Sequence, residues 1–182
     1  MEVNSMNYCV NKPYPSVEQL DMNVAYGQMM LSNLGGLHSE MNAVSLYFYN
    51  HVITKQSWPK LAKVMQEISF VEMHHLEIFA DMCTHLAVDP RLWDCQNDFL
   101  EYWSPGYNVY PRQMNIMLEN AIKEEENTIR IYQSQIACID EPIIQDVLNR
   151  IILDEQLHIH IFQELLDEYN QNRQERMKTD FY

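Results

Sequence analysis

The sequence is poor in glycine, with only four in 182 residues, and no stretch alternates convincingly between polar and apolar side chains. All-β domains are built from many short alternating strands joined by turns rich in glycine and proline, so this absence argues against them. Hydrophobic residues make up 47% of the chain and recur mostly at helical spacing. We therefore expect a single all-α domain, long enough to bury a substantial core.

Basic residues are also scarce. The chain has 12 Lys and Arg against 26 Asp and Glu, which gives a formal net charge of −14. Binding to nucleic acid or to an anionic membrane requires Lys and Arg to neutralise phosphates. The composition therefore argues against both classes of partner.

The four cysteines form no CxxC motif and show no paired spacing; they are Cys9, Cys83, Cys95 and Cys138. The first residues contain no basic segment followed by an apolar one, and no apolar run approaches the ~20 residues of a membrane span. These absences favour a reduced, cytoplasmic protein.

Four long helical segments account for most of the chain. Pro13 and Pro15 exclude helix from an irregular arm at 1–15, and Gly35-Gly36 marks a close helix approach, a kink or a break in the first segment. Ser57 and Asp140 are expected to cap the second and fourth segments, which have prolines in their first turns. The predicted division is a bundle domain over 16–169, with helices at 16–54, 57–87, 112–137 and 140–169, a crossover at 88–111 and a polar tail at 170–182.

The lengths of the connections predict the topology. Short turns join the first helix to the second and the third to the fourth, so each pair forms an antiparallel hairpin. The long crossover lets the second hairpin return alongside the first. One long crossover in a four-helix bundle is the connectivity of ferritin-like folds.

Two copies of Glu-x-x-His lie on apolar helical faces, Glu72/His75 and Glu155/His158. A lone glutamate precedes each copy by about one helix: Glu40 stands 32 residues before Glu72, and Glu125 stands 30 before Glu155. The i, i+3 spacing lets a carboxylate and an imidazole of one helix reach the same ion. Four buried carboxylates require compensating cations, so the pattern predicts a two-metal site within the bundle.

The third helix offers three consecutive candidates for its ligand. Glu125 shares its face with Leu118, Ala121, Ile122, Ile129 and Tyr132, whereas Glu124 and Glu126 share theirs with polar residues. Glu125 is therefore the predicted inward residue. Glu40 and Glu125 are candidates for bridging or shuttling carboxylates, although a terminal role is equally open.

Several other residues have two interpretations. Tyr47 and Tyr132 each follow a lone glutamate by seven positions, and they are either core aromatics or hydrogen-bond partners of a ligand glutamate. Asp154, which directly precedes Glu155, is a candidate to orient an imidazole of the other hairpin. The equivalent position before Glu72 is Val71, so such support would be one-sided. The remaining histidines are expected to be surface or hydrogen-bonded residues, with His51 the least certain: His38, His51, His74, His85 and His160.

These motifs resemble the ferritin-like superfamily over about residues 22–169, and the paired Glu-x-x-His helices are similar to its rubrerythrin, bacterioferritin and manganese catalase branches. LGGLHSEM (Leu34–Met41) is similar to the Leu-Gly-Gly-x-x-Gly-Glu stretch of manganese catalases, with Ser39 in place of glycine, and VEMHHLEI (Val71–Ile78) is similar to their second motif. Glu124 stands where manganese catalases often have a basic residue, and the CxxC electron-donor site of rubrerythrins is absent. By motif match, the resemblance implies metal ligands at Glu40, Glu72, His75, Glu125, Glu155 and His158.

The function that this resemblance implies is redox chemistry at two manganese or iron ions, without haem. We expect a homo-oligomer that acts on hydrogen peroxide or dioxygen, chiefly as a catalase or as a peroxidase with an external electron donor. One alternative is ferritin-like iron oxidation and sequestration in an oligomeric assembly. Another is a structural bundle with a vestigial metal site.

Overall fold

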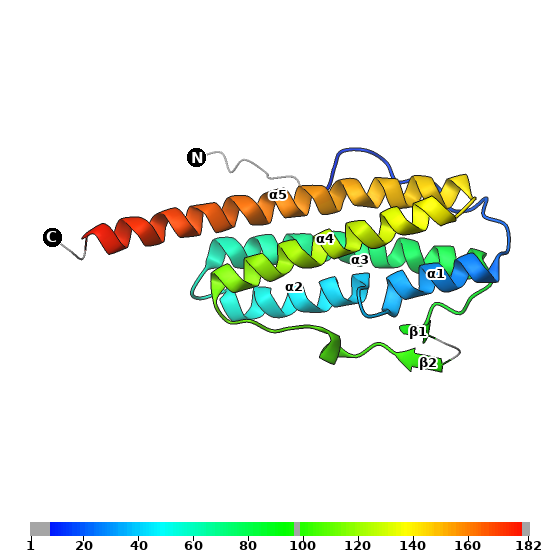
Figure 1. Cartoon of the computed structure of the whole chain (residues 1–182), viewed down its shortest axis with the longest axis horizontal. Helices are drawn as coiled ribbons and strands as arrows, with labels where there is room; N and C mark the ends of the chain where they lie inside the picture. The colour runs from blue at the N-terminus through cyan, green and yellow to red at the C-terminus, as the bar shows by residue number, and fades with distance from the viewer. Residues whose placement is uncertain (1–7, 97–98, 180–182) are drawn as a thin grey trace.

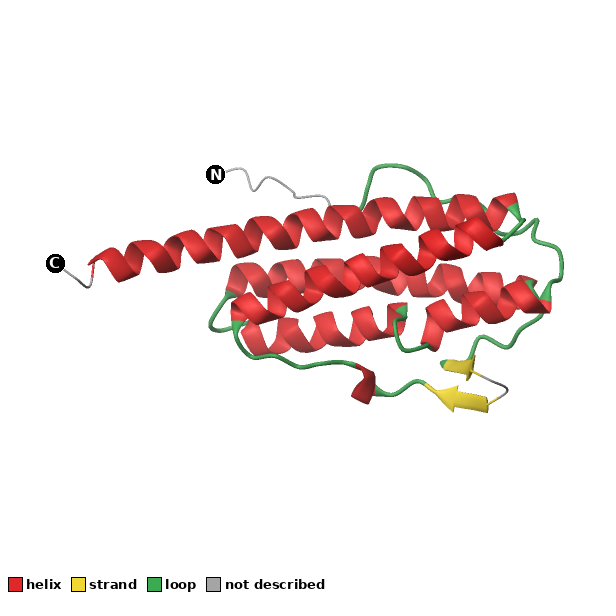
Figure 2. Ribbon diagram, in the orientation of Figure 1, coloured by secondary structure: helices red, strands yellow, loops and turns green. Residues whose placement is uncertain are grey.

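The computed structural model describes residues 8–96 and 99–179, and it consists mainly of long helices with one small hairpin of strands (Figure 1, Figure 2). Residues 1–7 of the expected arm and 180–182 of the expected tail lie outside this part of the chain. The elements are α1 (Val24–Gly35), α2 (Glu40–Thr54), α3 (Pro59–His85), β1 (Trp93–Gln96), β2 (Phe99–Tyr102), a short 3-10 helix (Pro105–Tyr107), α4 (Met114–Cys138) and α5 (Pro142–Thr179).

The helices pair as the connection lengths predicted. α2 packs against α3, and α4 packs against α5, while α1 lies end to end with α2 along α3 (Figure 1). The chain crosses from one end of the bundle to the other between α3 and α4, passing through the strand hairpin. The predicted ferritin-like four-helix bundle is confirmed, with the first of its four helices split into α1 and α2.

The split occurs at Gly35-Gly36. Of the three options that the sequence left open there, a close helix approach, a kink or a break, the structure shows a break. Gly36 has an extended backbone and ends α1, and α2 begins four residues later at Glu40. A Cβ atom at Gly35 would lie 2.8 Å from the backbone nitrogen of Trp93. The missing side chain therefore allows the crossover to pack directly on the end of α1.

Several helix ends differ from the predicted ones. α1 begins at Val24, because the side chain of Asn23 caps it by accepting a hydrogen bond from Tyr26 N at 3.1 Å, and no helix forms from Ser16. At α5, Glu141 rather than Asp140 accepts a side-chain hydrogen bond from the first turn. The N-cap position of α3 is occupied by Trp58 rather than Ser57.

The polar segment after Tyr169 also differs from the expected tail. α5 continues through it to Thr179 and extends beyond the rest of the bundle (Figure 1). This segment lacks apolar periodicity, and its residues from Asn170 to Glu175 are exposed. Its helix therefore continues the buried part of α5, and residues 170–175 lie outside the buried core.

The crossover contains a strand pair that the sequence did not reveal. β1 and β2 are antiparallel, with Trp93 opposite Tyr102, and β1 contacts α1. Every side chain of β2 is exposed. Strands of four residues are too short to show a clear alternation, so periodicity could not predict them.

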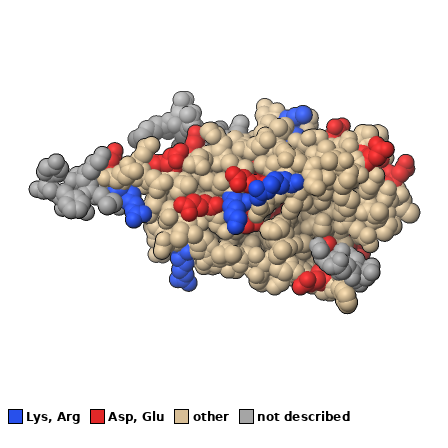
Figure 3. Space-filling view, in the orientation of Figure 1, with Lys and Arg blue, Asp and Glu red and all other residues tan. Residues whose placement is uncertain are grey.

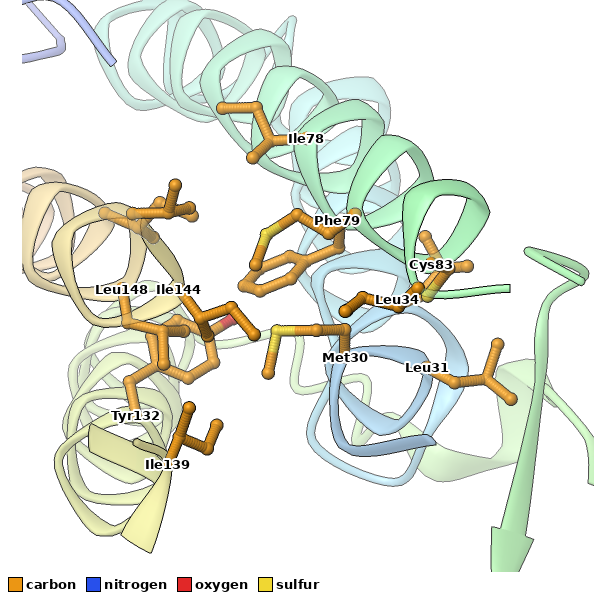
Figure 4. Close-up of a cluster of buried hydrophobic side chains, with 14 of the residues drawn as sticks. Met30, Leu31, Leu34, Ile78, Phe79, Cys83, Tyr132, Ile139, Ile144 and Leu148 are labelled. Atoms are coloured by element: carbon orange, nitrogen blue, oxygen red, sulfur yellow. The ribbon is translucent and has the colours of Figure 1, made fainter. Parts of the chain in front are cut away.

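Two clusters of buried apolar side chains form the core. Met30, Phe79 and Tyr132 belong to the cluster between α1, α3, α4 and α5 (Figure 4). Tyr47 and Phe162 belong to the second cluster, around α2 and the other half of the bundle. The buried polar residues discussed below contact Tyr132 of one cluster and Tyr47 of the other, so they lie between two dry regions.

The surface carries no sign of a basic binding patch on the face shown in Figure 3, where acidic and basic side chains are intermixed near the centre. Within the described residues, no helix combines the length and the apolar character that crossing a membrane requires.

We predict that Gly35→Ala destabilises the fold by about 1–3 kcal/mol, because the new methyl group would displace the backbone of the crossover. This loss outweighs the gain of up to about 1 kcal/mol that alanine offers over glycine within a helix. Urea denaturation of the metal-free protein measures the change in unfolding free energy.

Gly106→Ala is the matched control, since a Cβ there would meet only the flexible Ser104 hydroxyl at 3.3 Å. Its effect should stay within about 0.5 kcal/mol. Equal effects of the two substitutions would contradict a packing role for Gly35.

Candidate metal centre

Six buried side chains converge at the middle of the bundle, each no more than 2% exposed. They come from α2, α3, α4 and α5, and their donor atoms form two groups in which all four atoms lie within 4.8 Å of one another. The first group is Glu40, Glu72, His75 and Glu155, and the second is Glu72, Glu125, Glu155 and His158. The structure thus brings together all six residues that the sequence singled out as ligands.

Glu72 and Glu155 lie between the two histidines. The Nδ1 atom of His75 is 3.0 Å from Glu72 Oε2 and 3.2 Å from Glu155 Oε1. The Nδ1 atom of His158 is 2.9 Å from Glu72 Oε1 and 3.0 Å from Glu155 Oε2. Each of these carboxylates therefore offers one oxygen to each histidine side.

Glu40 and Glu125 occupy the two ends of the cluster. Glu40 Oε2 is 3.8 Å from His75 Nδ1, and Glu125 Oε1 is 3.8 Å from His158 Nδ1. Each glutamate thus approaches a single histidine. Of the bridging and terminal roles left open for these residues, this arrangement favours the terminal one for both.

The two tyrosines hydrogen-bond to these outer glutamates across the hairpins. Tyr47 on α2 donates to Glu125 Oε1 on α4, and Tyr132 on α4 donates to Glu40 Oε1 on α2. Both tyrosines also pack in the apolar clusters, so the two interpretations of these residues are both correct. The two hydrogen bonds are reciprocal. They match the equal spacing in the sequence, where Tyr47 and Tyr132 each follow a lone glutamate by seven positions.

Glu125 is also the inward residue of its triplet. It is 2% exposed, whereas Glu126 is exposed and Glu124 is half-buried, 3.2 Å from His38 Nδ1. The face assignment made from the apolar neighbours of Glu125 is confirmed, because those neighbours pack into the bundle and carry Glu125 inward with them.

The outer nitrogens of both histidines face acceptors. His75 Nε2 is 3.2 Å from Asp154 Oδ2 and 3.2 Å from the hydroxyl of Tyr14, while His158 Nε2 is 2.9 Å from the backbone oxygen of Tyr8. A carbonyl or carboxylate oxygen only accepts, so each Nε2 donates and each Nδ1 is the nitrogen directed at the glutamates. The predicted support of an imidazole by Asp154 is present, and it is one-sided as expected.

A buried arginine holds this outer layer together, and the sequence analysis missed it. Arg150, 2% exposed, donates to Asp154 Oδ2 at 2.7 Å and to the backbone oxygens of Lys12 and Val10 at 2.8 Å each. Its guanidinium also lies 4.1 Å from the centre of the Tyr14 ring. The arm before α1 is thereby held against α5. The one available signal was a charged residue at i−4 from Asp154 on an apolar face.

Burial and mutual contacts shift the pKa values of the cluster in opposite directions. Burial raises the pKa of Glu40 to about 8, and burial together with neighbouring carboxylates raises that of Glu125 well above its usual range. Burial by itself would lower the pKa of His75 and His158, but the surrounding carboxylates raise both. For Glu72, burial by itself would raise the pKa, as it does for Glu40, but the two histidines lower it below its usual range. Without metal, protons therefore offset the carboxylate charge.

The donor set fits two divalent cations. Among the described residues, Glu72 Oε1 and Glu155 Oε1 are buried oxygens that accept no hydrogen bond, although each lies near a histidine nitrogen. A buried oxygen without a partner is costly, and two cations, one beside each histidine, would satisfy one of these oxygens each. Metal binding would displace protons from the histidines and the outer glutamates, since ligands must be deprotonated.

The other histidines lie outside this cluster. His51 is buried, and its Nδ1 is 2.8 Å from the backbone oxygen of Ala62, so it is a hydrogen-bonded core residue. His74 and His160 are exposed and lie beside glutamates of their own helices. The expectation that these residues are surface or hydrogen-bonded histidines is confirmed for them.

We predict that Arg150→Ala lowers the unfolding free energy of the metal-free protein by about 3–5 kcal/mol, because it leaves the buried Asp154 carboxylate and two backbone oxygens without their cation. Denaturant titration followed by circular dichroism measures the loss. Arg130→Ala is the control, since Arg130 is exposed on α4, and its effect should stay within about 0.5 kcal/mol. A loss for Arg150→Ala as small as that of the control would contradict a structural role for this network.

Solved structures share this architecture. KatB, a manganese catalase from Anabaena, superposes with a TM-score of 0.78 at 18% sequence identity, covering 91% of this chain and 81% of the catalase chain. The bacterioferritin BfrA from Mycobacterium tuberculosis gives 0.71 at 17% identity, covering 88% and 96%. The Rhodobacter capsulatus bacterioferritin gives 0.70 at 18% identity, covering 84% and 89%. At these identities the likeness establishes the ferritin-like fold.

Comparison with curated proteins gives no match. The family model described as Rubrerythrin matches residues 35–166, with a further match over 116–181. The first of these stretches contains all six converging residues as well as Tyr47 and Tyr132. The chain belongs to the rubrerythrin family.

Proposed function

We propose that this protein binds two manganese or iron ions and uses them to decompose hydrogen peroxide. The observation that carries the proposal is the position of Glu72 and Glu155, each directing one oxygen to either histidine, with one buried oxygen of each lacking a hydrogen bond. Two carboxylates in this position are suited to bridging two cations.

The distances suggest how the ligands divide. His75 and Glu40 would hold one ion, His158 and Glu125 would hold the other, and Glu72 and Glu155 would contact both. Each ion would thus have a similar oxygen-and-imidazole environment. This donor set suits manganese and iron alike, so it does not select between them.

Two adjacent redox-active ions, when bound, would allow two electrons to be exchanged with a molecule that contains an O–O bond, and would stabilise charge on both of its oxygen atoms. The protein's own residues would position and insulate this chemistry. Tyr47 and Tyr132 hold the outer glutamates in place through hydrogen bonds. The apolar clusters on either side exclude water and strengthen electrostatic interactions within the centre.

Disproportionation of peroxide is favoured over a donor-dependent reaction because the sequence contains no CxxC pair that could hold an electron-transfer iron. Similarity to a manganese catalase over most of both chains supports this choice. The bacterioferritin likeness supports a second candidate, oxidation and storage of iron in a homo-oligomeric shell. One relative, a Bacteroides fragilis thioferritin, is described as dodecameric.

We predict that Glu125→Gln lowers the metal content below two ions per chain and slows peroxide consumption by about 10- to 100-fold, because the amide cannot supply a carboxylate charge. Elemental analysis of natively expressed protein and oxygen evolution measured with an electrode provide the two readouts. Glu126→Gln is the matched control: Glu126 is the exposed neighbour, and its replacement should leave both readouts unchanged.

Oxygen evolution without a reductant is the expected behaviour of the unmodified protein. Peroxide loss that depends on a reductant and yields no oxygen would replace the catalase assignment with a peroxidase. Iron loading far above two ions per chain in a large assembly would support storage. Near-zero metal after purification without chelators would leave a structural bundle with a vestigial site.

A further inference from the structure

A small pocket leads from the surface toward the Glu125 end of the metal centre. It has a volume of about 20 Å³, which is room for about one water-sized molecule. Glu125 and Tyr47 lie among its lining residues, and so do Ser39, His38, Asn108 and Glu124. The pocket therefore lies between the start of α2 and the middle of α4.

Ser39 has an unusual environment within this pocket. It is 5% exposed, and its hydroxyl makes no hydrogen bond within the described residues. Ser39 occupies the N-cap position of α2, yet its side chain does not cap the helix. A buried hydroxyl without a partner destabilises a fold, so stability does not explain why a serine stands at this position. A molecule that hydrogen-bonds to the hydroxyl as it passes through the pocket would explain it.

The outer part of the pocket is lined by a polar pair. His38 Nδ1 lies 3.2 Å from Glu124 Oε2, and both side chains are more than a third exposed. Glu124 lies at the exposed part of the pocket and Glu125 at its buried part, so a carboxyl group stands at each end. The chain as a whole carries a net charge of −14. Anions are disfavoured in such a passage, whereas small neutral molecules are not.

The opposite side of the centre is covered. The arm before α1 places the Tyr8 backbone oxygen on His158 and the Tyr14 hydroxyl on His75, and Arg150 holds the arm in place. Approach to the ions from the histidine side would require this arm to detach. The pocket beside Glu125 requires only side-chain movements.

We propose that this pocket is the entrance to the metal centre for a small neutral molecule containing an O–O bond, and that the size of the side chain at residue 39 determines what passes. The inference rests on the proposed function, since it deals with access to the same two ions. Ser39 would donate or accept one hydrogen bond as the molecule passes toward Glu125. The narrow volume excludes bulkier hydroperoxides.

Substitutions at Ser39 test the proposal directly. Ser39→Val replaces the hydroxyl with a methyl group and adds a second methyl group, while Ser39→Ala removes the hydroxyl and leaves the passage open. The backbone at Ser39 is extended, with φ of −117°, and accommodates valine. No capping bond is lost in either variant. Ser32→Val is the control, because Ser32 lies on α1 and bonds only its own helix.

The probe is nitric oxide, a neutral diatomic molecule, added under anaerobic conditions to full-length protein loaded with ferrous iron. Its binding rate is followed by stopped-flow absorbance after iron content has been measured. We expect Ser39→Val to slow binding by about 10-fold or more at unchanged iron content. Ser39→Ala and Ser32→Val should bind at the unmodified rate or faster.

Binding to Ser39→Val at the unmodified rate would overturn the assignment of the entrance. The proposed function fails separately, if iron-loaded and manganese-loaded protein both leave peroxide intact while nitric oxide binding still depends on residue 39. With both proposals correct, kcat/KM for peroxide falls in Ser39→Val in parallel with the nitric oxide rate.

Discussion

The concentration of ionisable groups at the dry centre of the bundle is the constraint on which the rest of the structure depends. Four carboxyl groups and two imidazoles lie within a few ångströms of one another, each at most 2% exposed. Such a cluster is stable only when its charge is balanced, by protons in the metal-free protein or by cations. The apolar clusters on both sides make that balance necessary, because they exclude the water that would otherwise solvate the charges.

The fold meets this constraint with two similar hairpins that complete each other. Each contributes one Glu-x-x-His helix and one helix with a lone glutamate, and each provides the tyrosine that bonds the glutamate of the other. The symmetry ends at the outer nitrogens. His75 faces the ionised Asp154, whereas His158 faces a neutral backbone oxygen. Burial by itself would raise the pKa of Asp154, but hydrogen bonds from His75 and Tyr14 lower this pKa to about 2.

The convergence of the six side chains was predictable because it follows from helical periodicity. Glu125 was separable from Glu124 and Glu126 because all but one of its neighbours at i±3, i±4 and i±7 are apolar or aromatic, and burial of those neighbours determines which way it points. The role of Glu40 and Glu125 was less predictable. Spacing along a helix says which face a residue shares but not how far its oxygens lie from a histidine on another helix.

Apart from Asp154, the outer layer could not be derived from the sequence. The arm has no periodic pattern. Apart from the Tyr14 hydroxyl, its contacts come through the backbone atoms of Tyr8, Val10 and Lys12, which any residue carries. The β1–β2 hairpin was missed because its strands have only four residues each and every side chain of β2 is exposed, so no apolar alternation marks it. The helical continuation of α5 past Tyr169 was missed because local composition there is polar, while the helix is propagated from its buried part.

The sequence by itself determined the helices of the bundle, their hairpin connectivity and the six side chains directed into its centre, since these depend on contacts between residues a few positions apart. Only the tertiary structure decided which carboxylates lie between the histidines, which atoms contact the outer nitrogens and which residues form the small pocket beside Glu125. These features depend on distances between segments such as Tyr8 and His158, or His38 and Glu124, that are far apart along the chain. No local pattern records such distances, because they are set by how the helices pack together.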